Sequence, residues 1–159
     1  MGPFVPSPAA SELAKLRGEP LAQELPEIDI DAVAAAHHAV RQGVRSGALS
    51  SAHDIAEGGL AVALAECCLA GRLGASIELE SAAPAAETLF GEGPGGFIVS
   101  GAPEAIRSLS GRVSTRRIGT TGGAELRIEL AGGGERTALA LTLPELSAAH
   151  ADGLAAYFA

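Results

Sequence analysis

Apolar residues recur along this chain at two spacings, one typical of helices and one typical of strands. The helical spacing predicts helices at 29–47, 57–71, 84–90 and 103–109, and a further one that begins at 142. Alternation of apolar and polar residues, or a short apolar run, predicts strands at 51–55, 75–79, 97–99, 112–118, 125–130 and 137–143. This order favours an α/β (α+β) domain of two layers, in which one mixed β-sheet carries helices mainly on one face.

The helix expected over 29–47 has signals at both ends. Asp29 or Asp31 can cap its start, and Gly47 can end it. The apolar positions at helical spacing are Val33, His37, Val40 and Val44. We expect this face to be packed, with His37 as a core or interface residue rather than a ligand.

Turn and cap signals also mark the last part of the chain. Residues 131–134 are Ala-Gly-Gly-Gly, which indicates a hairpin loop whose glycines take positive φ. Thr142 and Glu145 have the spacing of a capping box. The final helix is therefore expected to begin at this point.

The first 28 residues differ from the rest of the chain. They are rich in proline, with one short helical pattern at 11–17, and Pro20 and Pro26 keep the remainder extended. We therefore predict an N-terminal arm or linker at 1–28 and a single domain at 29–159.

Composition sets the nature of the core and argues against several partners. The chain has 159 residues, 47% of them hydrophobic but only 3% aromatic, so its core is built from Ala, Leu, Ile and Val. A formal net charge of −8 argues against nucleic acid, because phosphate binding needs a basic face. No apolar run approaches the ~20 residues of a membrane span, and the first residues lack the regions of a secretion signal. A cytoplasmic protein is expected.

The segment 51–60, Ser-Ala-His-Asp-Ile-Ala-Glu-Gly-Gly-Leu, holds the clearest candidates for chemistry. It is interpreted as a strand ending in His53 and Asp54, a turn at Gly58 and Gly59, and a helix start. Free N–H groups there, with paired glycines, favour a phosphate. Asp54 is a candidate magnesium ligand on that phosphate, and His53 a candidate acid or base. The alternative is structural, with acidic residues as helix caps and His53 hydrogen-bonded at the strand end.

A second glycine-rich segment spans 89–100. Its order is helix, loop and strand, whereas a dinucleotide fingerprint needs strand, loop and helix, and Pro94 removes a backbone donor. The segment is therefore not a dinucleotide-binding loop. Glu92 remains a candidate to face a ligand, with a solvated turn residue as the alternative.

Two other groups of residues are weaker candidates for a functional site. Four arginines gather in one part of the sequence and are interpreted as a solvated or interface face rather than a phosphate site: Arg107, Arg112, Arg116 and Arg117. The adjacent Cys67 and Cys68 lack the spacing of a zinc site and are interpreted as small core residues. No catalytic triad and no phosphate-binding P-loop is found, so no catalytic residue is assigned.

These segments resemble the large subunit of phosphoribosylformylglycinamidine synthase. Residues 51–66 are similar to its "SAHDVSDGGLAVALAE" segment, and 89–92 with 97–100 to its "LFGESxGRFVVS" element. Residues 11–16 resemble the entry to the same domain, and 143–146 through 153–154 its C-terminal helix and tail. The resemblance runs in order from about residue 4 to 158, and it indicates the C-terminal domain related to aminoimidazole ribonucleotide (AIR) synthase.

The resemblance implies an ATP-dependent carbon–nitrogen ligase of purine biosynthesis. Such an enzyme uses ATP and Mg²⁺ to activate formylglycinamide ribonucleotide, which ammonia from a glutaminase converts to formylglycinamidine ribonucleotide. The large subunit holds two pairs of N- and C-terminal domains, and this chain looks like the second C-terminal domain. In the first copy, the counterpart of Asp54 binds magnesium and the counterpart of the Glu92 turn touches the substrate. The likeness thus implies nucleotide or phosphate roles for His53, Gly58, Gly59 and Glu92, in addition to the case that these residues make by themselves.

The implied partners are the N-terminal domains of the same synthase, its glutaminase and its small accessory subunit, and a homo-oligomer is a further option. The family's Ser-Asp before the paired glycines is Ala56-Glu57 here, and its turn serine and arginine are Gly93 and Gly96. Those changes remove a hydroxyl and a guanidinium from the loop. We expect ATP or ADP and Mg²⁺ to serve the full enzyme, and the isolated domain to be inactive. The alternative is a stand-alone, non-catalytic module that binds a small anion or assembles through its helices.

Overall fold

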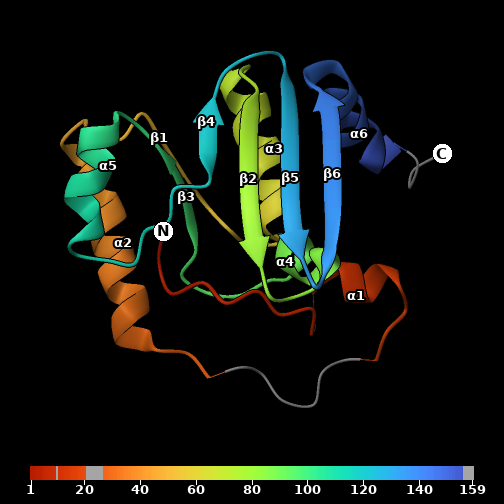
Figure 1. Cartoon of the computed structure of the whole chain (residues 1–159), viewed down its shortest axis with the longest axis horizontal. Helices are drawn as coiled ribbons and strands as arrows, with labels where there is room; N and C mark the ends of the chain where they lie inside the picture. Colours follow the sequence, from red (N-terminus) through yellow and green to blue (C-terminus); the bar gives the residue numbers. More distant parts are fainter. Residues whose placement is uncertain (10, 21–26, 156–159) are drawn as a thin grey trace. The chain divides into compact units, whose positions relative to one another are not determined.

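The computed structural model describes residues 1–9, 11–20 and 27–155. In chain order, the elements of this part are α1 (Glu12–Leu16), α2 (Ile30–Arg45), β1 (Ser51–Asp54), α3 (Gly59–Gly71), β2 (Ala75–Ser81), α4 (Ala85–Phe90), β3 (Phe97–Ser100), α5 (Pro103–Ser110), β4 (Gly119–Thr121), β5 (Glu125–Gly132), β6 (Glu135–Thr142) and α6 (Leu143–Ala155) (Figure 1). This mixture confirms the expected α/β class. Among these helices, none is both long and apolar enough to cross a membrane.

The chain divides into two compact units. The first unit comprises residues 1–63 and 86–117, and the second comprises 64–85 and 118–159. Helix α3 begins in the first unit and continues into the second. The expected boundary between an arm at 1–28 and a domain at 29–159 stays a prediction, and the expected extended stretch at Pro26 lies outside the described residues.

The second unit is built on a four-stranded mixed sheet. Its strand order is β4-β2-β5-β6, with β2 and β5 parallel and the other neighbours antiparallel. Alternate side chains of β2 and β5 are buried, namely Ala75, Ile77, Leu79, Leu126, Ile128 and Leu130. Figure 1 shows α3 behind these two strands. One face of the sheet thus forms the core with the helices, as the alternating sequence predicts.

In the first unit, β1 and β3 form a separate antiparallel pair. Ser51 lies opposite Ser100, and Asp54 lies opposite Phe97. The expected single sheet is therefore wrong in this respect, since the described strands form two sheets. The physical reason is that β1 has no fully buried side chain and carries polar residues at three of its four positions. It offers no apolar face to the core of a larger sheet.

Helix α2 is confirmed, but a different face of it is buried. The Asp29 carboxylate accepts a hydrogen bond of 2.9 Å from the Ala32 amide and so caps the helix. The buried positions are Ala36, Ala39, Val40 and Gly43, whereas Val44 is 52% exposed. A Cβ on Gly43 would lie 2.8 Å from Leu49 Cδ1. The buried face thus consists of Val40 and three small residues, whose close approach to the neighbouring chain sets the orientation of this helix.

The expected strand at 112–118 is wrong. The amides of Arg112 and Val113 still donate to the Leu109 carbonyl, at 2.9 and 3.3 Å, so this stretch continues the end of α5. The strand begins at Gly119 instead, where a Cβ would collide with the carbonyl oxygen of Ser76 in β2. Alternation alone predicted the wrong segment because the pairing with β2 needs a glycine at its first position.

The end of the chain follows its local signals closely. Gly133 and Gly134 have φ of 59° and 85°, so the two glycines complete a tight turn and both flanking strands extend further toward it than predicted. At the start of α6, the Thr142 amide and hydroxyl donate to Glu145 Oε2 at 2.8 and 2.7 Å. The predicted hairpin and capping box are both confirmed.

Candidate functional site

Strand β1 ends at the two polar residues that the sequence singled out. His53 Nδ1 lies 2.6 Å from the Asp54 carbonyl oxygen and 3.7 Å from Asp54 Oδ1. Because a carbonyl oxygen only accepts, Nδ1 carries the proton and donates it. The Asp54 side chain is 66% exposed and that of His53 is 35% exposed. The imidazole is thus oriented by the chain beside it, while the Asp54 carboxylate faces solvent.

The helix that follows begins at Gly59, two residues later than predicted. Gly58 and Gly59 have φ of 79° and 69°, which L-residues rarely adopt. A Cβ on Gly59 would lie 2.6 Å from the Gly91 carbonyl oxygen and 2.9 Å from that of Leu89. The paired glycines are therefore required by the backbone itself. Glu57 lies outside the helix and does not occupy its first turn.

Glu92 occupies the helix start where an external anion was expected. Its Oε1 accepts hydrogen bonds from the Gly58 amide at 2.9 Å and from the Glu12 amide at 2.8 Å. Its backbone exchanges two hydrogen bonds with Ser7, of 3.0 and 2.8 Å. Glu92 is therefore neither a solvated turn residue nor turned toward open space. Its carboxylate supplies the negative charge that the helix start favours.

The five candidate residues thus form two groups. Gly58, Gly59 and Glu92 meet at the start of α3, while His53 and Asp54 contact each other at the end of β1. Among the described residues, no three His, Cys, Asp or Glu side chains gather to hold a metal ion. Asp54 therefore offers one exposed carboxylate, which fits magnesium because that ion is commonly held by one or two carboxylates, waters and phosphate oxygens.

The other residues that the sequence analysis considered make contacts within the protein or lie in its core. Arg107 donates to Glu104 at 2.9 Å on the exposed surface of α5, as a solvated face predicts. The expected core position of His37 is wrong, because the residue is exposed; its ring meets Phe97 edge-on with centroids 5.0 Å apart. Cys68 is buried and Cys67 half-buried, both as free thiols, and burial raises the pKa of each. The cysteines match their expected packing role.

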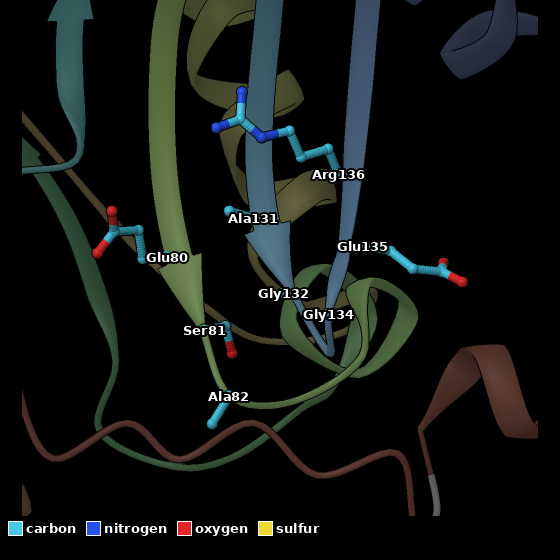
Figure 2. Close-up of a pocket in the computed structure, with 8 residues that line it drawn as sticks. All are labelled: Glu80, Ser81, Ala82, Ala131, Gly132, Gly134, Glu135 and Arg136. Atoms are coloured by element: carbon cyan, nitrogen blue, oxygen red, sulfur yellow. The ribbon is translucent and has the colours of Figure 1, made fainter.

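A pocket that sequence reasoning missed lies in the second unit. It has a volume of about 560 Å³ and lies where β2 and β5 end and β6 begins, lined by Glu80, Ser81, Ala82, Ala131, Gly132, Gly134, Glu135 and Arg136. Figure 2 shows Arg136 extending across β5, while the carboxylates of Glu80 and Glu135 point away to either side. None of the predicted site residues lines it. Its lining residues come from two segments, 80–82 and 131–136, which are far apart in the sequence, so local patterns give no signal for it.

Comparison with known proteins identifies relatives for most of the chain. A family model described as "AIR synthase related protein, C-terminal domain" matches residues 9–128. The phosphoribosylformylglycinamidine synthase subunit PurL of Moorella thermoacetica is 39% identical over 152 residues, which cover 92% of this chain and 20% of that protein. PurL of a Nostoc species is 42% identical over 104 residues, covering 63% of this chain and 13% of that protein. The chain spans about a fifth or less of the curated relatives it matches.

Solved structures with a similar fold come from Thermotoga maritima. PurLQS of that organism superposes with a TM-score of 0.62 at 16% identity, covering 87% of this chain and 24% of that chain. PurL complexed with FGAR gives a TM-score of 0.59 at 17% identity, covering 76% of this chain and 21% of that chain. At such identities the likeness concerns the fold, and it agrees with the mixed α/β architecture described above.

Proposed function

Because this chain belongs to the family of AIR synthase related proteins, as their C-terminal domain, we propose that it is part of a ligase that forms formylglycinamidine ribonucleotide. The observation that supports this most is the match to the M. thermoacetica subunit, which extends over 92% of the chain. It agrees with the resemblance found in the two glycine-rich motifs. The chemistry uses ATP, Mg²⁺ and ammonia, and belongs to a protein about five times longer than this chain.

Within that enzyme, this domain acts as a scaffold that completes a nucleotide site. Asp54 is the residue that would hold magnesium, and a bound magnesium ion would neutralise negative charge on a nucleotide phosphate. The Asp54 carboxylate is exposed and so accessible to groups from a neighbouring domain. The His53 ring is oriented by the contact of its Nδ1 with the Asp54 carbonyl oxygen and can contact a ligand beside it. Glu92 and Gly58 serve the architecture of the domain, since each already bonds to the other.

The partners follow from the same proposal. They are the N-terminal domains of the synthase, with its glutaminase and small accessory subunit, and self-association of the domain is a further option. The names of the relatives support a multi-component enzyme, since PurL is described as a subunit and PurLQS as one structure. A cytoplasmic location stays a prediction from the sequence.

The proposal is tested by exchange of domains. The matching 152-residue region of the M. thermoacetica subunit is replaced by this chain, and the chimera is expressed in cells that require purines because they lack the enzyme. We expect growth without added purine, whereas the same subunit with the region deleted gives none. A chimera that is folded and abundant but does not support growth would contradict the proposal.

The isolated chain provides the complementary measurement. With ATP, Mg²⁺, ammonia and formylglycinamide ribonucleotide, we expect no product from the chain alone, because no catalytic residue is assigned to it. Formation of product would contradict the scaffold role. If the chimera fails while the isolated chain gains thermal stability from ADP with Mg²⁺, the alternative of a stand-alone anion-binding module is favoured.

A further inference from the structure

The N-terminal segment Pro3–Ser7, called the strap below, lies along the loop Gly91–Gly96 of the first unit. The glycines of this loop make room for it. A Cβ on Gly93 would lie 2.5 Å from the Val5 carbonyl oxygen, a contact that real Cβ atoms do not make. A Cβ on Gly96 would lie 2.7 Å from Phe4 Cδ2. The loop is therefore shaped around the strap.

The same close fit continues to both ends of the loop. A Cβ on Gly91 would lie 2.8 Å from Pro6 Cβ, and one on Gly95 would lie 3.1 Å from Pro3 Cγ. Four glycines thus face four successive residues of the strap. These four positions therefore accommodate the strap because they have no side chain.

Backbone hydrogen bonds fasten the segment on either side of these contacts. Ser7 exchanges two with Glu92, and the Phe97 amide donates one of 2.9 Å to the Met1 carbonyl. The Gly2 amide donates to the Ser114 carbonyl at 2.8 Å. The segment therefore runs antiparallel to the stretch 92–97 and is held at each end.

Glu92 joins the strap to the rest of the first unit, because its backbone bonds Ser7 and its side chain bonds two further amides. Glu92 Oε1 bonds the Glu12 amide, which follows the strap, and the Gly58 amide, which precedes α3. Hydrogen bonds to an ionised carboxylate are about twice as strong as those between neutral groups. The strap itself is packed on one side only, since Val5 is 71% exposed. Glu92 thus connects the strap to the start of α3 through its backbone and its carboxylate.

We propose that the strap is a lid over the loop Gly91–Gly96, called the glycine loop below, and that it detaches from this loop as one piece. Glu92 is the residue that holds the lid in place, called the latch below. In the closed form, residues of the chain cover the loop and the Gly58 amide is engaged. A molecule that contacts this face of the loop meets it only after the latch is released. The proposal goes beyond the function proposed above and does not depend on it.

Hydrogen exchange of single amides in the full chain tests the latch. The reporters are the Ser7 amide, at the end of the strap, and the Phe97 amide, which donates to the Met1 carbonyl just before the strap begins. In Glu92→Gln, which keeps the size but removes the charge, we expect both to exchange about tenfold faster or more, because a hydrogen bond to a charged group is weakened. Acceleration of Ser7 alone, or of neither amide, would overturn the proposal.

A second variant and a control separate opening from unfolding. Phe4→Ala removes the ring that lies on Gly96 and should accelerate the amides of Ser7, Glu12 and Phe97 together. Glu57→Gln neutralises an exposed acid next to Gly58 and should leave all three unchanged. Amides of β5 in the second unit report the global fold. Suppose that the β5 amides exchange as slowly in Phe4→Ala as in the parent, and that the amides of Ser7, Glu12 and Phe97 also stay protected. The fold is then intact and the strap does not open as one piece.

Discussion

At the scale of single residues, Gly59 shows how the backbone dictates the sequence at the start of α3. Its φ is 69°, and the carbonyl oxygens of Leu89 and Gly91 occupy the space where a Cβ would lie. Gly59→Ala should therefore destabilise the fold by about 1–3 kcal/mol, the usual cost of a side chain held in such a conformation, and by more if the carbonyls must move. Chemical denaturation at neutral pH measures the loss.

A matched control lies at the other end of the same helix. A Cβ on Gly71 meets nothing within 4 Å, and alanine favours helices. Gly71→Ala should therefore leave the free energy of unfolding unchanged or raise it by up to about 1 kcal/mol. Equal losses from both variants would show that the carbonyls around Gly59 do not constrain it.

The candidate site could be predicted from the sequence only in part. Spacing and residue type pointed to His53, Asp54 and the paired glycines, because strand end, turn and helix start are local features. The partner of Gly58 could not be found this way, since Glu92 lies 34 residues further along the chain, and its other donor, Glu12, is 80 residues away from it. A carboxylate in a glycine loop looks the same in sequence whether it meets a ligand or an amide of its own chain.

At the scale of elements, the start of α6 makes a prediction about pH. The hydroxyl and amide of Thr142 donate to Glu145, and these hydrogen bonds lower the pKa of Glu145. A carboxyl whose pKa is lower in the folded state stabilises the fold above its unfolded pKa and loses that contribution as pH falls through the folded pKa. The difference in Tm between the parent and Glu145→Gln should therefore shrink as the pH is lowered below the ordinary glutamate value.

The control for this prediction is Glu135→Gln, which neutralises an exposed glutamate at the start of β6, away from the cap. Its Tm should run parallel to that of the parent over the same pH range. A Glu145→Gln variant whose Tm difference from the parent is the same at neutral and acidic pH would show that the capping box does not contribute through its charge.

Elements with a strong period or a cap were predictable, and those defined by pairing were not. The Asp29 cap and the two-glycine hairpin act over a few residues, so the chain encodes them locally. The segment 112–118 alternates like a strand but is held by α5 and Gly2, and β4 begins only at Gly119. The position of β4 depends on the close approach of its backbone to β2, which the spacing of apolar residues does not reveal.

At the scale of the whole molecule, charge makes the clearest prediction. The formal net charge is −8, with 19 acidic and 11 basic residues. Counter-ion release on binding needs a basic face, so the protein should not shift duplex DNA or RNA in a gel at physiological salt. A gel shift of the nucleic acid that weakens steeply as salt is raised would contradict this prediction. It would point to a local basic surface, such as one formed by the arginines between 107 and 117.

The division into two sheets could not have been foreseen from element order. Short strands such as β1 and β3 give the same pattern whether they join a larger sheet or pair with each other. The alternation in β2 and β5 is clearer because one face of their sheet is buried and the other exposed. Whole-molecule topology is thus encoded most clearly where a core forms.

The fit between the strap and the glycine loop also has a consequence for how these sequences diverge. Phe4 occupies the space that a side chain at position 96 would need, and the Val5 carbonyl does the same for position 93. Mutations on the two segments are therefore not independent during evolution. Across homologues, a large residue at 96 should be inherited together with a small residue at 4 or with a diverged strap, as expected of positions in direct contact.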